Sequence, residues 1–223
     1  MPTSKPRSQR RTVSLSRERL IHAAIAILDA DGEDALTFRV LASRLATGSG
    51  AIYHYVANKD ELLKAATADV IADGLKEVSS AADPLEDIRV LALEVFDAID
   101  AHPWVGTQLS REPWQFAIVQ IFEAVGTRLQ ALGVADEAQF DSASAIVNYI
   151  LGLAGQYAAA ARLHPRATDR TEFLQAIAAE WKRLGDEDFP FVHRMAGKLD
   201  GHEDRAQFLT GIDLILSGIQ ANG

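Results

Sequence analysis

The sequence predicts an all-α protein with a three-helix, helix-turn-helix head and a larger helical domain. Three observations lead to this prediction. Alanine- and leucine-rich segments with few prolines fill the chain, and Val, Ile and Thr never alternate with polar residues over a sustained run. A short turn near residues 46–48 separates two helical patterns. Apolar residues make up 48% of the 223, which is ample for a hydrophobic core.

The charges are divided unevenly along the chain. Residues 1–64 hold ten Lys or Arg against seven Asp or Glu, a net charge of +3, whereas residues 65–223 hold 12 against 24, a net charge of −12. The two parts sum to the net charge of −9. Such a basic head can approach phosphates that an acidic body avoids. Residues 1–15 are basic and poor in apolar side chains, which predicts a disordered tail. The tail charges are either merely solvated or part of an arm that reaches DNA.

Several classes of protein are excluded or disfavoured. The chain has no cysteine, so disulfides, thiolate metal sites and cysteine nucleophiles are ruled out. It has no apolar run of the ~18 residues that a membrane span needs and no signal-peptide core, so we expect a cytoplasmic protein without a membrane partner. The histidines that invite a metal interpretation, His102, His164, His193 and His202, lack ligand spacing. No phosphate loop or nucleophile elbow occurs, so neither a cofactor nor an enzyme is expected.

The head is predicted from residues 16–63. Ser16 is a plausible N-cap of the first helix, which Asp31-Gly32 ends, and Thr37 caps the second. A third helix from about Ser49 to Tyr55 follows the turn, and a fourth opens at Asn58 or Lys59. Helical spacing turns certain apolar residues inward: Val40, Leu41, Ala42, Leu45, Ile52 and Val56.

Two motifs identify the head more closely. Thr37-x-Arg39-x-Leu41-Ala42-x-x-Leu45 is followed by Gly50-Ala51-Ile52-Tyr53-His54-Tyr55-Val56-x-Asn58-Lys59-x-x-Leu62. Together they resemble the DNA-binding head of the tetracycline-repressor (TetR) family of bacterial transcription regulators. One position departs from the family pattern, because Ala46 stands where a turn glycine is usual and Gly48 comes two residues later. An alanine in a left-handed conformation costs ~1 kcal/mol, so the turn could be reshaped here. The sequence does not fix the exact orientation of the third helix, which would enter the DNA groove.

The resemblance implies a set of DNA contacts. Arg39 matches a residue that reaches a base edge, and its planar fork suits guanine. Residues 49–51 match positions that enter the major groove, His54 matches a variable groove contact, and the remaining aromatic and basic positions match phosphate contacts. The implied DNA-binding set is Thr37, Arg39, Ser49, Gly50, Ala51, Tyr53, His54, Tyr55 and Lys59. The alternative for the aromatic residues is packing within the head.

The body, residues 64–223, is predicted to hold further helices. One runs from Pro84 and stops before Pro103, and His102-Pro103-Trp104 is interpreted as a kink or turn. Others are expected near 114–133, from about Phe140 to Leu163, over 172–184, and over about 203–220. Loops are expected at 165–171 and 185–190.

Polar residues within the long apolar helix indicate a ligand site in the body, because buried polar groups need partners. Together with aromatic residues of neighbouring segments, the candidate set for a small-molecule effector is Phe96, His102, Trp104, Trp114, Phe116, Asn148, Tyr149 and Gln156. The alternative is ordinary core or dimer packing with internally satisfied polar groups.

The last helix carries a broad apolar face, which either pairs with a second copy or covers the chain's own core. TetR-like proteins pair through the last helices of the body, and the resemblance therefore favours a homodimer. The candidate interface consists of Leu153, Tyr157, Phe208, Leu209, Ile212, Ile215, Leu216 and Ile219.

The sequence thus predicts a homodimeric regulator that binds double-stranded operator DNA and is most simply a repressor released by a small-molecule effector of unknown identity. Two alternatives from other classes remain: a constitutive DNA-binding protein without an effector, and a helical ligand-binding protein that no longer binds DNA. The direction of regulation, as repressor or activator, is not encoded in any residue pattern.

Overall fold

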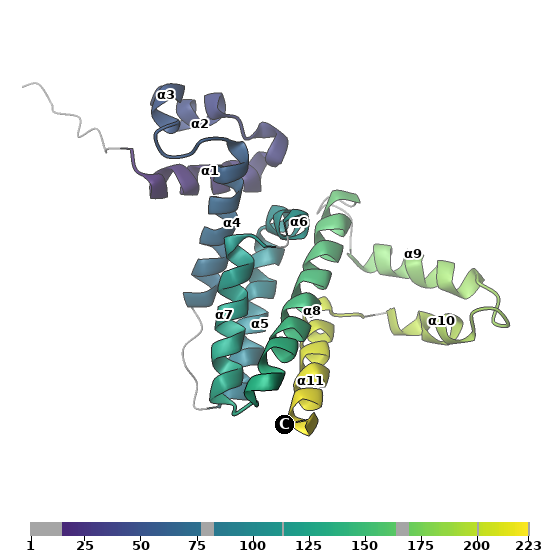
Figure 1. Ribbon diagram of the computed structural model, residues 1–223. Helices are drawn as coiled ribbons and strands as arrows, with labels where there is room; N and C mark the ends of the chain where they lie inside the picture. Colours follow the sequence, from purple (N-terminus) through teal and green to yellow (C-terminus); the bar gives the residue numbers. More distant parts are fainter. Residues whose placement is uncertain (1–14, 77–82, 113, 164–169, 200, 223) are drawn as a thin grey trace, which may run out of the picture. The chain divides into compact units, whose positions relative to one another are not determined.

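The computed structural model describes residues 15–76, 83–112, 114–163, 170–199 and 201–222. Every regular element within these ranges is a helix, which confirms the all-α prediction (Figure 1). The chain forms two compact units that divide between Ala66 and Thr67, inside helix α4 (Lys59–Lys76). Residues 1–14 of the predicted tail, 1–15, lie outside the described residues.

The first unit is built on α1 (Arg17–Asp31), a 3-10 turn η1 (Glu33–Ala35), α2 (Phe38–Arg44), α3 (Ser49–Ile52) and the start of α4. The caps predicted from the sequence are present. The Ser16 side chain accepts a hydrogen bond from the Arg19 N–H, and Thr37 Oγ1 accepts one from the Val40 N–H, each at 3.2 Å. Both bonds satisfy N–H groups that have no partner within their helix.

Helix α4 begins with a reciprocal cap. Asn58 Oδ1 accepts from the Glu61 N–H at 2.8 Å, and Glu61 Oε2 accepts from the Ala57 N–H at 2.7 Å. This pair fixes the start of α4. The core of the unit is fully apolar and includes Leu20, Ile27, Leu36, Leu41, Ile52 and Leu62, each at most 1% exposed.

Three local predictions for this unit need correction. Helix α3 ends at Ile52, and residues Tyr53 to Tyr55 form a turn rather than a further helical stretch. Val40 is 41% exposed instead of inward-facing, and Leu45 is only half-buried. The cause is the brevity of α2 and α3, since a helix of one or two turns has room for few inward positions.

The second unit places α5 (Pro84–Ala101), α7 (Phe116–Ala131), α8 (Asp136–Leu163) and α11 (Asp204–Asn222) side by side, with α6 (Pro103–Arg111) packed against α8 (Figure 1). Helix α8 contacts α5, α6, α7 and α11, and is therefore the central helix of the unit. Asp83 caps α5 by accepting a hydrogen bond from the Leu85 N–H at 3.0 Å.

The kink or turn expected at residues 102–104 is a break at His102, and the helix α6 that follows it was not predicted. Pro103 occupies the first turn of a new helix, where its missing N–H costs nothing, and His102 separates that helix from α5. Helix α8 also begins earlier than expected, at Asp136 instead of Phe140.

Helix α9 (Arg170–Arg183), α10 (Pro190–Met195) and the 3-10 turn η2 (Ala196–Leu199) pack mainly against one another. The expected loop after residue 184 is present and leads into α10 at Pro190. Most of the loop expected at residues 165–171 lies outside the described residues.

Candidate DNA-binding surface and body cavity

The turn between α2 and α3 is held in a left-handed conformation at Ala46. Its φ is 51°, the one positive φ outside glycine among the described residues. The Thr47 N–H donates to the Ala42 carbonyl at 2.9 Å, which closes the turn onto α2. Gly48, at φ −87°, precedes α3 as its N-cap and does not adopt the left-handed form. The strain expected from the missing turn glycine therefore falls on Ala46.

Helix α3 turns one buried side chain, Ile52, into the core and leaves the rest of its surface outward. Most of the predicted DNA-binding residues are exposed, namely Thr37, Arg39, Ser49, Gly50, Tyr53 and His54, and Ala51 is half-buried. The Tyr53 ring, 59% exposed, packs edge-on against Phe38 with ring centroids 4.8 Å apart. Tyr53 thus has both a packing role and a free surface.

Two of the residues predicted to contact phosphates make hydrogen bonds within the first unit. The Tyr55 hydroxyl donates to the Leu15 carbonyl at 2.8 Å, which fixes the start of α1. A phosphate only accepts hydrogen bonds, so this hydroxyl has no proton left for one in the observed arrangement. Lys59 Nζ donates to the Glu33 carbonyl in η1, but an ammonium group has three N–H donors and two remain. The structure therefore favours a structural role for Tyr55 and leaves the Lys59 prediction in place.

The predicted effector residues do not form one site. Phe96 and Tyr149 lie on either side of Phe208 in what we call the closed cluster, formed by these three residues of α5, α8 and α11. The Phe96 and Phe208 rings are 4.9 Å apart and the Tyr149 and Phe208 rings 5.6 Å apart, both pairs stacked. The Tyr149 hydroxyl donates to the Phe208 carbonyl at 3.3 Å, and burial raises the Tyr149 pKa. In this cluster the predicted effector residues Phe96 and Tyr149 pack against a buried ring of α11.

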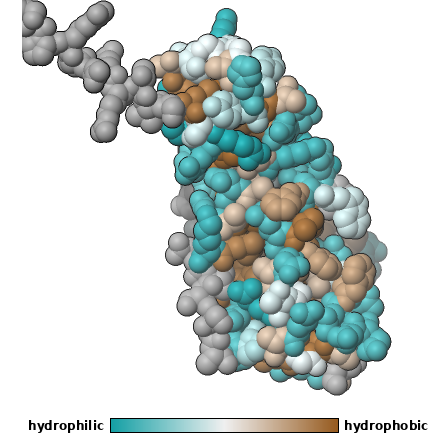
Figure 2. Space-filling view, turned by 60° about the vertical axis from the view of Figure 1, so that its left-hand side comes forward, coloured by the Kyte–Doolittle hydropathy of each residue, from teal (hydrophilic) through white to brown (hydrophobic). Residues whose placement is uncertain are grey.

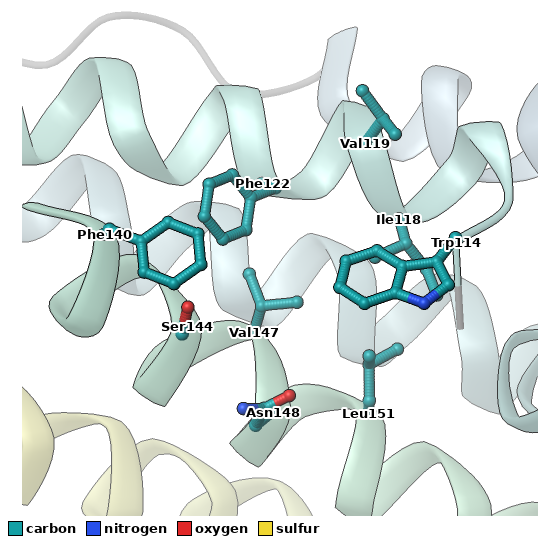
Figure 3. A pocket seen from close by; sticks show the side chains of 9 residues that line it. All are labelled: Trp114, Ile118, Val119, Phe122, Phe140, Ser144, Val147, Asn148 and Leu151. Carbon is teal, nitrogen blue, oxygen red and sulfur yellow. The ribbon is translucent and has the colours of Figure 1, made fainter.

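A second group of aromatic residues lines an open groove between α7 and α8 (Figure 3). The cavity has a volume of about 330 Å³. Two predicted residues, Trp114 and Asn148, belong to its walls, and periodicity had not singled out the others. The described residues that line it are Trp114, Ile118, Val119, Phe122, Phe140, Ser144, Val147, Asn148 and Leu151. We call this cavity the open groove.

Exposed apolar side chains mark the surface around the open groove. Trp114 is 88% exposed, Phe140 66% and Val119 52%. Figure 2 shows brown and tan apolar residues reaching the surface between teal hydrophilic ones on the face that it presents. Contiguous exposed apolar surface of this kind usually marks a binding site.

The remaining predicted effector residues lie apart from the open groove. Trp104 is buried at the start of α6, and the His102 ring is 6.2 Å from it. Phe116 is 67% exposed and Gln156 is exposed, and neither lines the groove. The sequence missed Phe122, Phe140 and Leu151 because helix periodicity does not say which helix stands opposite a given face.

The predicted dimer face of α11 is divided in the structure. Phe208, Ile212 and Leu216 are at most 1% exposed in the single chain, so they belong to its own core and cannot contact a partner, which corrects the prediction. Leu209, Ile215, Ile219 and Leu153 are half-buried, and the side chain of Tyr157 lies outside the described residues. Leu214, which the prediction omitted, is 71% exposed.

In the described part of the chain, no group of three or more His, Asp or Glu side chains is arranged to hold a metal ion. His202 instead pairs with Asp204, Nε2 to Oδ1 at 3.3 Å. None of the described helices is both long and apolar enough to cross a membrane.

A helix-turn-helix unit with an exposed second helix, joined to a separate helical unit, defines the class of DNA-binding transcription regulators. Residues 20–66 match the family described as bacterial regulatory proteins of the tetR family, and residues 83–222 match the tetracyclin repressor-like C-terminal domain. The chain belongs to the TetR family of regulators, whose members bind DNA and are not enzymes.

Regulators from Streptomyces and Saccharopolyspora species are similar to this chain. The solved structure of the transcriptional regulator SCO7222 from Streptomyces coelicolor is 45% identical, with a TM-score of 0.83 over 93% of this chain and 99% of that one. An HTH-type transcriptional regulator of Saccharopolyspora erythraea is 28% identical over 97% of this chain and 90% of its own length. The repressor DrrR1 of Streptomyces coeruleorubidus is 26% identical, and the match covers 93% of this chain and 78% of that protein.

The fold is also that of ActR from Streptomyces coelicolor, whose structure in complex with actinorhodin has a TM-score of 0.75. ActR is 24% identical in sequence, and the match covers 94% of this chain and 99% of that one. This likeness confirms the architecture of a helix-turn-helix unit followed by a helical body.

Proposed function

We propose that this protein is a cytoplasmic, homodimeric repressor that binds operator DNA through α2 and α3 and leaves it when a small molecule binds in the body. The observation that carries the proposal is the exposed surface of α3, where Ile52 is the one buried side chain and the neighbouring Arg39, Tyr53 and His54 are free to meet DNA. Repression is the direction printed for the relative DrrR1, which matches along most of this chain.

Arg39 is the proposed base-reading residue. Its side chain is exposed on α2, and a guanidinium can donate two parallel hydrogen bonds to guanine O6 and N7. Ser49, Gly50 and Ala51 have small side chains that permit close approach to the groove but few directional contacts. Tyr53, His54 and Lys59 complete the proposed surface, with Lys59 directed at a phosphate.

The homodimer is proposed to form through α8 and α11. Leu214 is largely exposed on α11, and Gly218 and Gly152 on the same two helices are exposed, so little side-chain bulk separates the helices from a partner. Two heads so joined must present their α3 helices about one DNA turn, roughly 34–36 Å, apart to dock in successive major grooves.

The effector is proposed to act from the body, residues 64–223, where the open groove supplies a cavity of about 330 Å³. That ActR, which has this fold, is found with actinorhodin supports a small-molecule site in such a body. An effector with different affinities for the DNA-bound and free arrangements would release the operator by that difference.

A selection of bound sequences from random double-stranded DNA tests the proposal. We expect a palindromic operator whose half-sites are about one helical turn apart. Arg39→Ala is expected to lower operator affinity by about 1–3 kcal/mol and to relax preference at one base pair. Lys59→Ala is expected to weaken binding to all sequences and to flatten its salt dependence. Equal loss of specificity in the two variants would reject the assignment.

A further inference from the structure

Among the described residues, those that line the open groove include no charged side chain. Seven of the residues that line it are aromatic or aliphatic, and its two polar residues, Ser144 and Asn148, are both uncharged. A charged ligand group placed between these walls would lose water without gaining an opposite charge. The chemistry of the walls therefore selects an uncharged molecule.

Trp114 is positioned at the groove although almost nothing packs on it. It lies in the turn before α7, and the next residue, Gln115, pins that turn: Gln115 Nε2 donates to the Gln108 carbonyl at 2.8 Å and to the Glu112 carbonyl at 3.3 Å. Gln115 itself is 7% exposed, whereas Trp114 is 88% exposed. A buried anchor thus holds an exposed indole beside the cavity.

The groove offers flat surfaces on more than one side. Figure 3 shows the Trp114 ring near Leu151 and Ile118 at one end, and the Phe122 and Phe140 rings at the other. The centroids of those two phenyl rings are 5.8 Å apart. Aromatic rings bind other rings by stacking or edge contact, so the walls favour a planar ligand over a branched aliphatic one.

From these observations we infer that the open groove binds an uncharged, planar aromatic molecule, which contacts Trp114 with one face and the Asn148 amide with a polar edge. The inference rests on the proposed function, since it names the chemical class of the effector. The cavity volume of about 330 Å³ lies at the small end of the range for ligand pockets and matches a compact fused-ring compound.

Two dyes that differ by one charge test the chemical class. N-phenylnaphthylamine is neutral and aromatic, and anilinonaphthalene sulfonate is its sulfonated analogue; both fluoresce more strongly in apolar surroundings. With the full chain, we expect the neutral dye to bind at least about tenfold more tightly. Equal or tighter binding of the sulfonate would overturn the inference.

Variants of the lining test the location. Trp114→Ala is expected to weaken binding of the neutral dye about tenfold, and Ser144→Phe, which fills the groove from α8, to abolish it. The matched control is Phe116→Ala, which removes an exposed aromatic residue two positions from Trp114 that does not line the groove. This control is expected to leave the dissociation constant of the neutral dye within about twofold of the wild-type value. Equal losses in Trp114→Ala and Phe116→Ala would contradict the assignment.

A charge placed in the groove gives an independent test that does not depend on loss of binding. Asn148→Lys adds an ammonium group at an exposed position of α8 and is expected to bring the sulfonated dye to within about threefold of the neutral one. If the preference for the neutral dye is unchanged, the dye lies elsewhere and the inference fails.

The protein concentration provides a further test. Dye affinity that falls as protein concentration rises would show that a second copy of the chain covers the groove, which also overturns the inference.

The operator assay separates this inference from the proposed function. If the neutral dye binds in the groove and operator affinity does not change, the ligand class holds and effector release fails. If some charged or aliphatic molecule releases the operator, and the groove variants do not alter that release, the proposed function holds and this inference fails.

Discussion

The body contains two aromatic clusters that look alike in sequence and differ in the structure. In the closed cluster, Phe208 lies between Phe96 and Tyr149 and is 1% exposed. In the open groove, Phe140 and Trp114 are 66% and 88% exposed. The first cluster has a third helix, α11, to cover it, whereas the second is formed by α7, the turn before it and α8. The number of helices that meet, rather than residue type, decides whether aromatic residues stabilise the fold or remain available to a ligand.

The largest expected effect separates the two clusters by stability. Phe208→Ala removes a buried ring that two others stack on, and is expected to lower the free energy of unfolding by about 3–5 kcal/mol. The control Phe140→Ala removes an exposed ring and is expected to cost less than about 1 kcal/mol. Urea denaturation at one fixed protein concentration measures both, because association changes apparent stability. Similar losses in the two variants would show that the groove is part of the core.

The next effect concerns the close approach of α11 to α8. A Cβ atom added at Gly211 would overlap the hydroxyl and ring of Tyr149, which its stacking on Phe208 holds in place. Gly211→Ala is therefore expected to lower the free energy of unfolding by about 1–3 kcal/mol. At Gly126, inside helix α7, an added Cβ meets nothing within 4 Å.

Gly126→Ala is the matched control, and it is expected to be neutral or stabilising by up to about 1 kcal/mol, because alanine favours the helix more than glycine does. Thermal unfolding followed by circular dichroism compares the pair. If Gly211→Ala is as stable as the control, Tyr149 does not occupy the position described.

A smaller effect comes from the Tyr149 hydroxyl. Tyr149→Phe removes the hydrogen bond to the Phe208 carbonyl, and at neutral pH we expect it to cost about 0.5–1 kcal/mol. Burial raises the Tyr149 pKa, so the unfolded chain ionises first as the pH rises past about 10. The wild-type folded state therefore loses stability above that pH through this group, whereas the phenylalanine variant does not.

The difference in stability between wild type and Tyr149→Phe is thus expected to shrink from about pH 9 to about pH 11. Urea denaturation across that range measures the difference. A difference that stays constant would mean that Tyr149 titrates alike in the folded and unfolded chain.

The two clusters also show how far sequence reasoning reached. The caps at Ser16 and Thr37 and the strain at Ala46 were predictable, because each depends on neighbours within a few residues. The ligand site in the body could not be predicted in this way. Phe96, Tyr149 and Trp114 were grouped by residue type, but whether a helical face meets α7 or α11 is set by tertiary packing, which a 3.6-residue period does not encode.

The same reason explains the division of the predicted dimer face. Phe208, Ile212 and Leu216 recur every four residues and form the ridge that packs on the chain's own helices, while Leu214 lies on the opposite side. An apolar stripe on the last helix indicates that something covers it, and only the packing of α11 on α5 and α8 shows that the chain itself does.

The smallest expected effect comes from the ion pairs that join α11 to α5 beside the closed cluster. Arg89 Nε lies 2.6 Å from Asp213 Oδ1, and Arg205 binds Asp97 with two nitrogens, at 3.0 Å each. All four side chains are partly exposed, so water and salt screen their attraction.

Arg205→Met keeps much of the aliphatic stem and removes the charge, and is expected to lower the free energy of unfolding by at most about 1 kcal/mol. The loss should shrink further in high salt, because wild type then loses the same attraction. Comparison of urea midpoints at low and high salt measures it. A loss as large as that of Phe208→Ala would mean that charge pairing, rather than the stacked rings, holds α11 against α5.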